Sequence, residues 1–595
     1  MRIENTDHLF QKIRNRIKLE SEMLLESTNL DLRTLERNHD YKHSTQIKSL
    51  EKLMEHFHDA GEMLTLPYQY EQEILSNKAM TALQNNESTT CVRQIIKEAL
   101  AKTKANESDY INKPLIAFEP QLFHLLAMTY AKDKDINTAI TILRSVLSNM
   151  DVYPPDDRTK EVQVIPMLLT LARYLMQVKD YVGALATCDT GFNIAARRNQ
   201  GKYCPDFLHI KILTYIAVDN KDVCRSLLAK TFAGYVALNN ADAANEILRI
   251  AREQLNVSLE TYGMELLLNN TTQKKLVNQP PRDSTTLGDM LKSFLGQTIF
   301  KRKIIYNGLC DSSTFTKLET DKIKSPNIFL VEALAQRMGR DIGLYHSFHS
   351  PAHEFNSWQL RDKIQVMMRE RKFKEANGHL KEFKSLERKK RYRHVILQQF
   401  IQLTEARIYG RKHSRKNEMP EYYTMLIDAI KLTIPNFDEN DIVNYPLTMQ
   451  EAIIINCIAA YYHIQEDLLH AELMYRQLLQ SIEAHWKNDT LKLQLYGNLS
   501  FNLSSCLGLL NQHKNAMSVV DKALEYCIIQ GHLKSMLGLY FNKGYILCNL
   551  KKDKEGLTHL ALAFYSYLLF ESHGKITEIE LIRSFVKEKY NINFT

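Results

Sequence analysis

Proline and glycine are scarce in this sequence. Its 595 residues include only 14 prolines and 20 glycines. Because these residues interrupt helices and open turns, their scarcity favours long helices over a strand-and-turn architecture. Long apolar runs are also missing, since no stretch approaches the roughly 18 apolar residues of a membrane span and the first residues hold no apolar signal segment. We therefore expect a cytoplasmic protein that does not enter a membrane.

Strong charge bias and paired cysteine motifs are lacking too. Subtracting the 69 acidic from the 77 basic residues leaves +8, which permits a nucleic-acid surface without requiring one. The nine cysteines form no CxxC pair, and Cys457 and Cys548 lie in apolar stretches, so we expect reduced core thiols instead of disulfides or a zinc site.

The sequence contains no motif that would make it an enzyme. There is no GxxxxGK[ST] phosphate loop, no GxSxG and no HExxH, and nothing assembles a nucleophile with a base. His346, His349 and His353 have the spacing of helical metal ligands, but Pro351 breaks the face they would share. We expect no enzymatic activity, no metal and no cofactor.

A helix pair recurs along the chain. In residues 125–147, the small residues Ala127 and Ala139 let two antiparallel helices approach closely while larger apolar residues fill the groove. The same pattern returns around Ala172 and Ala184, around Ala459 and Ala471, and around Ser504 and Ala516. Such pairs are typical of tetratricopeptide (TPR) repeats, which bury their apolar faces only by stacking. A generic helical bundle is the alternative.

These repeats are arranged in two sets. Three anchor pairs share one offset: 471 − 139, 516 − 184 and 543 − 211 (Lys211 and Lys543) all equal 332. Within each set the first two anchors are 45 residues apart, which is longer than the usual repeat of about 34. The common offset indicates two homologous arrays that align without gaps.

A segment of different character precedes the second array. Pro280 and Pro281 cannot continue a helix and mark a domain boundary. After them, Leu287, Leu291 and Leu295 predict a first short helix, and Ile304 and Ile305 predict a second. Gly308 permits a turn, Asp311 to Thr314 is a helix N-cap signal, and Phe315 and Leu318 mark the buried face of a third helix. This order is typical of a helix-turn-helix.

The first 60 residues echo this module. Thr34 matches Thr314 at an offset of 280, and Glu51 matches Glu332 at 281. The later offset of 332 leaves about 52 extra residues in the second copy, which fits one additional helix pair near 361–383. We therefore predict an all-α chain with two tandem copies of a small helix-turn-helix module followed by a TPR-like array. We predict a degenerate module at 1–62 followed by an array at 63–275. A second module at 284–345 is followed by a second array at 346–595.

The stretches GLCDSSTFTKLETDK, PNIFLVEALAQRMGRDI and KALEYCIIQGHLKSMLGLYFNKGYILCNLKKDKEGL give the sequence a family resemblance. It resembles the helix-turn-helix/TPR regulators of Gram-positive bacteria, the pheromone-sensing (quorum-sensing) group of Rgg-like and PlcR-like proteins, well over 284–595 and more weakly over 1–275. The resemblance implies a module that binds double-stranded DNA and an array that binds a short signalling peptide. The tandem arrangement departs from the family, whose members carry one such unit.

The resemblance also implies which residues contact DNA. In the family, the third helix of the module lies in the major groove and reads base edges with its first turn. The matching residues here are Ser312, Ser313, Thr314, Thr316 and Lys317, with Gln297 and Thr298 opening the second helix. In the first module, Asp31 and Glu36 would repel phosphate, so we expect that module to have lost DNA binding. If it still binds, the chain could act as an intramolecular pseudo-dimer instead of a homodimer.

The peptide-binding residues are predicted from recurring asparagines. Asn456, Asn498, Asn502 and Asn542 lie on the first helices of successive pairs, where asparagine is an unfavourable helix residue. A side-chain amide can pair with the N–H and C=O of an extended peptide. Hydrogen bonding between repeats is the alternative for each. The basic runs at 388–394 and 411–416 could touch DNA or could be solvated helix ends.

Two functions follow from these observations. One is a DNA-binding transcription regulator controlled by a peptide in the concave groove of its arrays. The other is a TPR scaffold that holds a partner protein without binding DNA.

Overall fold

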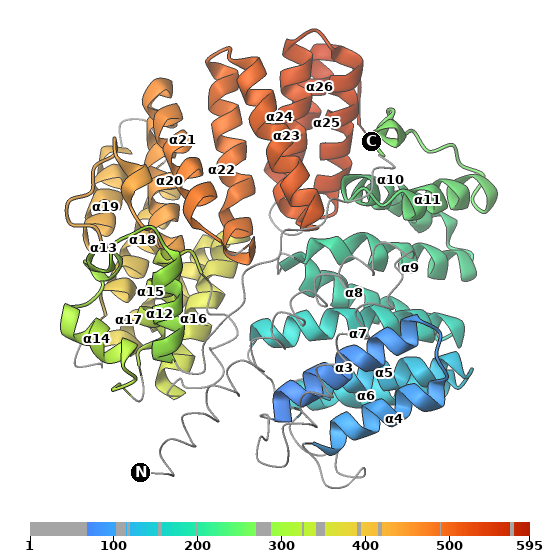
Figure 1. The fold of residues 1–595 in the computed structure, drawn as a ribbon. Coiled ribbons are helices and arrows are strands. Elements are labelled where there is room, and N and C mark those ends of the chain that lie inside the picture. Colours follow the sequence, from blue (N-terminus) through green and yellow to red (C-terminus); the bar gives the residue numbers. More distant parts are fainter. Residues whose placement is uncertain are drawn as a thin grey trace, which may run out of the picture. The chain divides into compact units, whose positions relative to one another are not determined.

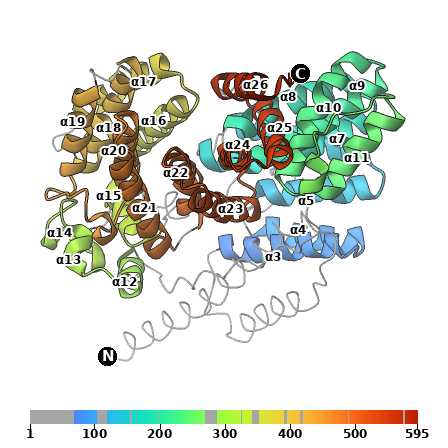
Figure 2. The same cartoon turned by 90° about the horizontal axis from the view of Figure 1, so that it is seen from above.

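The computed structural model describes residues 68–102, 115, 119–152, 157–197, 200–268, 287–323, 326–340, 352–388, 394–413, 419–487, 489–571 and 576–594. Within these ranges the regular structure is helical throughout (Figures 1 and 2), so the all-α prediction is confirmed. The module predicted at 1–62 lies outside the described residues. No helix in the described part of the chain combines the length and apolarity needed to cross a membrane.

The chain divides into two compact units. The first comprises Met1–Phe232, Asn245–Leu259 and Lys274–Thr285. Its described helices are α3 (Tyr68–Gln84), α4 (Thr89–Ala101), α5 (Glu119–Lys132), α6 (Ile136–Val152), α7 (Asp157–Gln177), α8 (Tyr181–Arg197), α9 (Cys204–Ala217), most of α10 (Lys221–Ala237) and most of α11 (Ala241–Glu253).

The second unit comprises Ala233–Ala244, Glu260–Gln273 and Thr286–Thr595. Its first helices are α12 (Leu287–Gln297), α13 (Arg302–Tyr306), α14 (Ser312–Glu319), α15 (Ile328–Arg337), α16 (Ala352–Arg369), α17 (Phe373–Arg388), α18 (Val395–Lys412) and α19 (Met419–Lys431). They are followed by α20 (Met449–Ile464), α21 (Leu468–His485), α22 (Asp489–Leu509), α23 (His513–Ile529), α24 (Leu533–Asn549), α25 (Asp553–Leu568) and α26 (Ile576–Tyr590). The pair α16–α17 occupies the place predicted for the additional helix pair.

The helix boundaries repeat the offset of 332 residues found in the sequence. Adding 332 to the bounds of α7 gives 489–509, which are the bounds of α22, and adding it to those of α8 gives 513–529, the bounds of α23. The turns repeat it as well. Lys134, Lys179 and Asp219 have positive φ angles, and so do Glu466, Asn511 and Lys551, each 332 residues further on.

Equivalent contacts accompany the equivalent helices. Lys211 Nζ lies 2.7 Å from Asp189 Oδ1 in the first array, and Lys543 Nζ lies 2.7 Å from Asp521 Oδ1 in the second. The small residues predicted between paired helices are all buried: Ala127, Ala139, Ala172, Ala184, Ala459, Ala471, Ser504 and Ala516. Close approach of the helices at these positions leaves no room for larger side chains.

The helices α12–α15, here called the module, do not form a core of their own. Met290, Phe315 and Leu334 belong to the same hydrophobic cluster as Ile364 on α16 and Phe400 on α18. The module is therefore packed as part of the second unit, and its orientation toward α16–α18 is set by shared apolar contacts.

Candidate nucleic-acid interface and the network behind it

Helix α14 begins at the cap that the sequence predicts. Asp311 Oδ1 accepts a hydrogen bond of 2.8 Å from the backbone N–H of Thr314, and the Thr314 hydroxyl donates to Asp311 Oδ2 at 2.8 Å. The backbone hydrogen bond from Thr314 holds the pKa of the Asp311 carboxyl below its ordinary value. An ionised cap at this position satisfies free N–H groups and fixes the first turn of the helix.

The two faces of α14 differ as predicted. Phe315 and Leu318 are buried in the module. The predicted DNA-contacting residues Ser312, Ser313, Thr316 and Lys317 are exposed, and Thr314 is half-buried beside its cap. The helix thus presents hydroxyls and one ammonium group to solvent on the face opposite its apolar anchor.

Arg302 ties α13 to α14. Its Nη2 donates to Thr316 Oγ1 at 2.7 Å and to Glu319 Oε2 at 2.5 Å, and its guanidinium lies 4.8 Å from the centre of the Phe315 ring. The Thr316 hydroxyl also donates to the Ser312 carbonyl at 2.8 Å. These bonds orient Thr316 and pair the acidic Glu319 inside the protein.

The prediction that Gln297 and Thr298 open the second helix is wrong. Gln297 is the last residue of α12, and α13 begins only at Arg302. The Gln297 side-chain carbonyl accepts from Arg340, and Thr298 Oγ1 accepts from the backbone N–H of Phe300 at 3.4 Å. Because the Phe300 ring packs 4.6 Å from the His485 ring of α21, the segment follows the array surface instead of continuing as helix.

A buried ion pair joins the module to the array. Arg337 at the end of α15 and Glu451 in the first turn of α20 approach to 2.5 Å, with 2% and 0% of their side chains exposed. Burial acts to raise the pKa of Glu451, but the charge and hydrogen bonds of Arg337, together with hydrogen bonds from Thr433 and Thr448, outweigh it and leave this pKa below its ordinary value. A carboxylate so deeply buried is stable only with a fixed partner of this kind.

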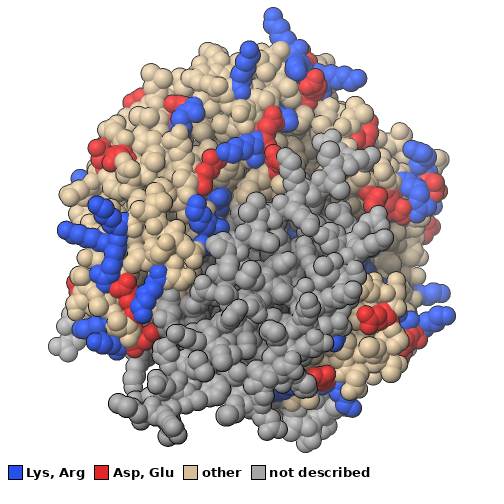
Figure 3. Space-filling model, viewed as in Figure 1, with Lys and Arg blue, Asp and Glu red and all other residues tan. Residues whose placement is uncertain are grey.

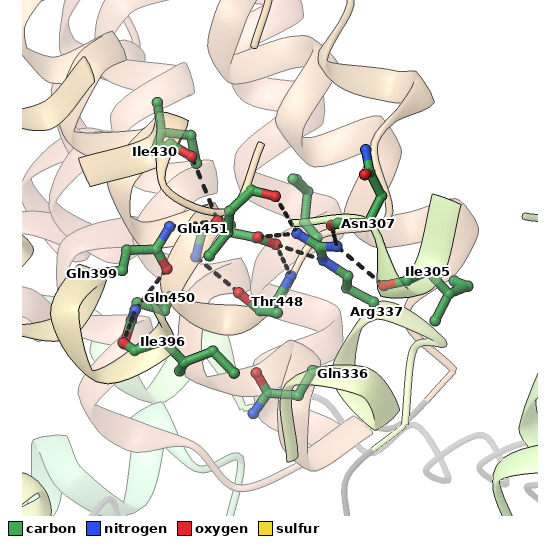
Figure 4. Close-up of polar contacts among 12 residues, drawn as sticks. Ile305, Asn307, Gln336, Arg337, Ile396, Gln399, Ile430, Thr448, Gln450 and Glu451 are labelled. Carbon is green, nitrogen blue, oxygen red and sulfur yellow. Dashed lines mark hydrogen bonds and ion pairs between the residues drawn. The ribbon is translucent and has the colours of Figure 1, made fainter. Parts of the chain in front are cut away.

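The other Arg337 bonds reach three carbonyl groups in two segments (Figure 4). Its Nη1 donates to the Asn307 carbonyl at 2.6 Å and to the Ile305 carbonyl at 3.1 Å, both at the end of α13. Its Nη2 donates to the Thr433 carbonyl after α19 at 3.0 Å. One side chain thus connects the ends of α13, α15 and α19 with the start of α20.

Glutamine and threonine side chains extend this network along the array. Glu451 and Thr448 form a capping box, with bonds of 3.1 Å from Glu451 N to Thr448 Oγ1 and 2.7 Å from Thr448 N to Glu451 Oε2. Gln450 donates to the Gln399 side chain at 2.6 Å, and Gln399 donates to Thr433 Oγ1 at 2.6 Å (Figure 4). The module, α18, α19 and α20 are therefore joined by continuous hydrogen bonding.

Two glycines allow the module to meet the array backbone. Gly308 (φ +75°) and Gly339 (φ +73°) adopt left-handed conformations. A Cβ atom at Gly308 would lie 2.0 Å from the Thr433 carbonyl oxygen, and one at Gly339 would lie 2.0 Å from that of His485. Gly308 was predicted as a turn residue, and its contact with Thr433 adds a second reason for glycine.

The predicted peptide-binding asparagines fall into two groups. Asn542 is buried and donates to the Phe501 carbonyl at 2.9 Å and to Ser504 Oγ at 2.8 Å, so the alternative of bonding between repeats holds for it. Asn502 Nδ2 donates to Asn456 Oδ1 at 3.1 Å between half-buried side chains, and Asn498 is exposed.

Two signals in the sequence mark the residues of the Arg337–Glu451 pair. The largely apolar run LVEALAQRMG (330–339) contains two charged residues, Glu332 and, near its end, Arg337. Thr448 and Glu451 have the spacing of a capping box. Neither signal names the partner, because the two residues are 114 positions apart.

The described residues offer no metal site. No group of three or more His, Cys, Asp or Glu side chains is placed to hold an ion in the described part of the chain. His346 and His349 lie outside the described residues, as does most of the two basic runs. All nine cysteines are described, and each is a free thiol.

On the coloured surface of the face drawn in Figure 3, basic and acidic side chains are interspersed.

Comparison with known proteins gives only distant structural likeness. No protein-family model and no curated protein sequence matches the chain. The crystal structure of Bacillus thuringiensis PlcR in complex with the peptide PapR7 and DNA aligns with 50% of this chain and 99% of that one, at 18% identity and a TM-score of 0.33. The anaphase-promoting complex hetero-tetramer Cut9–Hcn1 aligns with 85% and 96%, at 11% identity and a TM-score of 0.28. At these scores neither likeness bears on function.

Proposed function

We propose that the protein is a transcription regulator that binds double-stranded DNA through α14 and is controlled by a short peptide held on its arrays. The observation that supports this is the division of α14 between a buried face, Phe315 and Leu318, and an exposed face of hydroxyls with Lys317.

Each exposed side chain has a chemical task in this proposal. Ser312 and Ser313 at the start of α14 donate to phosphate oxygens or accept from base edges. Lys317 neutralises a phosphate and releases a counterion. Thr316 is held by Arg302 and so presents its methyl group and a fixed hydroxyl to the groove.

The peptide is bound by the amides of Asn456, Asn498 and Asn502. The bond between Asn502 and Asn456 uses one N–H and one carbonyl, which leaves the Asn456 amide nitrogen and the Asn502 carbonyl without a partner among the described residues. A donor and an acceptor side by side match the C=O and N–H of one extended peptide residue.

The Arg337–Glu451 pair provides the route from peptide to DNA. Glu451 lies in the first turn of α20, the helix that also carries Asn456, and Arg337 ends α15 of the module. A peptide that shifts α20 against α19 displaces the carbonyl and carboxylate that hold Arg337, and the module moves with them. Control requires that the peptide bind the two arrangements with different affinity.

The regulator acts in the cytoplasm and reads paired half-sites. Because one α14 covers a single half-site, the second is read by another copy of the chain or by the module predicted at 1–62.

A promoter-binding measurement tests the proposal. Fluorescence anisotropy with the DNA upstream of its own reading frame is expected to show salt-sensitive binding that a short peptide alters. Lys317→Glu should abolish that binding, whereas Lys514→Glu on the exposed surface of α23 should leave it intact. Absence of salt-sensitive binding, with and without candidate peptides, would refute DNA-dependent regulation.

One observation favours the scaffold alternative. The module shares its core with α16–α18, so packing alone could explain its retention. Under that alternative Lys317→Glu leaves the cellular function unchanged. The chain then binds a partner protein and not DNA.

A further inference from the structure

The two arrays carry equivalent strips of side chains with different chemistry. The first strip consists of His124 on α5, Thr170 and Arg173 on α7, and His209 on α9. Adding 332 to each number gives the second strip, which consists of Asn456 on α20, Asn502 and Ser505 on α22, and Phe541 on α24. No member of either strip is buried, although most of the residues around them are.

Both strips contain the same inter-helix hydrogen bond. In the first array, His124 Nε2 and Thr170 Oγ1 lie 2.9 Å apart between α5 and α7. In the second, Asn502 Nδ2 and Asn456 Oδ1 lie 3.1 Å apart between α20 and α22. The equivalent bond shows that the strips occupy the same place in each array, so differences between them are differences of composition.

The main difference is a cation. Arg173 is exposed and forms no ion pair among the described residues, whereas its counterpart Ser505 is neutral. Burial lowers the pKa of the His209 imidazole on the neighbouring helix α9, Glu246 raises it, and the positive charge of Arg173 lowers it to a smaller extent. The first strip therefore combines one fixed positive charge with two imidazoles and a hydroxyl.

The nearby carboxylate does not cancel this charge. Glu246, which faces His209 from α11, is bound by Arg249 through hydrogen bonds of 2.6 and 2.8 Å. Its negative charge is thus already compensated by a cation of its own helix, and Arg173 is left to carry the net charge of the strip.

We propose that the first array binds a second ligand, a peptide that carries a carboxylate, on the strip His124–Thr170–Arg173–His209. The second array binds an uncharged peptide segment through its asparagines. This inference rests on the proposed function insofar as both arrays bind peptides. The guanidinium of Arg173 forms a bidentate hydrogen bond with the carboxylate, and Thr170 and His124 contact the neighbouring peptide group.

Affinity selection with two synthetic peptide pools tests this division. The full chain is incubated with random heptapeptides that each contain Asp or Glu, and separately with amidated heptapeptides that lack all charged residues. Bound peptides are quantified by mass spectrometry. Wild-type protein should retain members of both pools, and retention of the acidic pool should fall with added salt.

Exchanges between equivalent positions provide matched variants. Arg173→Ser, which installs the residue of the second strip, should reduce acidic-pool binding about tenfold or more and leave the neutral pool unaffected. Asn502→Leu should do the reverse. Circular dichroism melting confirms that each variant is folded.

The outcomes separate the two proposals. Retention of neutral peptides with no Arg173-dependent acidic binding overturns the second site but leaves peptide control standing. Retention of neither pool contradicts peptide binding by both arrays. Acidic binding that survives Arg173→Ser also overturns the assignment of this strip.

Discussion

Arg337 and Glu451 are separated by 114 residues and form an ion pair that is almost completely withdrawn from solvent. The pair stands where the end of the module meets the first turn of α20. Because Arg337 also donates to carbonyls at the end of α13 and after α19, this one side chain adds a polar connection to the apolar core that the module shares with the array.

Removal of one partner should destabilise the second unit strongly. Arg337→Met leaves Glu451 charged, buried and unpaired, and we expect the free energy of unfolding to fall by about 3–5 kcal/mol. Urea unfolding followed by circular dichroism measures the loss. The double variant Arg337→Met/Glu451→Met should recover much of it, since no buried charge remains. Arg225→Met breaks an exposed pair with Asp222 and should cost no more than about 1 kcal/mol.

A single methyl group at Gly339 should disturb the contact between the module and α21. Gly339→Ala requires an alanine at φ +73° with its Cβ 2.0 Å from the His485 carbonyl oxygen, so backbone atoms must move. We expect the free energy of unfolding, measured by thermal or urea unfolding, to fall by about 1–3 kcal/mol. Gly378→Ala is the matched control, because nothing lies within 4 Å of a Cβ there and the residue is inside α17. That change should stabilise the protein by about 0.5–1 kcal/mol, and equal effects at both positions would contradict the structure.

Acidification should weaken the fold through buried histidines. Burial, together with the charges of Lys534 and Arg369, lowers the pKa of His532 from 6.5 to about 4. Between these two values the unfolded chain binds a proton at this site and the folded chain does not, so stability falls as the pH drops through that window. The contribution lost is up to roughly 3 kcal/mol. Urea unfolding at pH 7 and pH 4.5 should show a smaller decrease for His532→Asn than for the wild type. Identical decreases would contradict the low pKa of His532.

The sequence predicted the arrays better than the connection between module and array. Periodic small residues such as Ala139 and Ala471 can be recognised from the local sequence, because paired helices approach closely where the side chains are small. The cap at Asp311 is local as well and was found from its spacing. The docking of Phe300 on His485 and the pairing of Arg337 with Glu451 depend on contacts between distant segments, and no local pattern specifies which segments meet. The same limit explains why Asn542 could not be told from Asn498 before its burial was known.

The salt dependence of DNA binding should distinguish a residue that touches phosphate from one that only positions α14. Lys317 is exposed on the proposed contact face, so Lys317→Gln should lower the slope of log affinity against log salt concentration by about 0.9 and leave the melting temperature unchanged. Arg302 is engaged with Glu319 and Thr316 and should contribute no released counterion. Arg302→Gln should therefore lower the melting temperature and the affinity at every salt concentration while the slope stays the same. Anisotropy titrations with promoter DNA measure both slopes. Salt concentrations between roughly 50 and 200 mM are suitable, because the affinity of a phosphate-binding protein changes strongly over this range. If Arg302→Gln changed the slope and Lys317→Gln did not, the face of α14 assigned to DNA would be the wrong one.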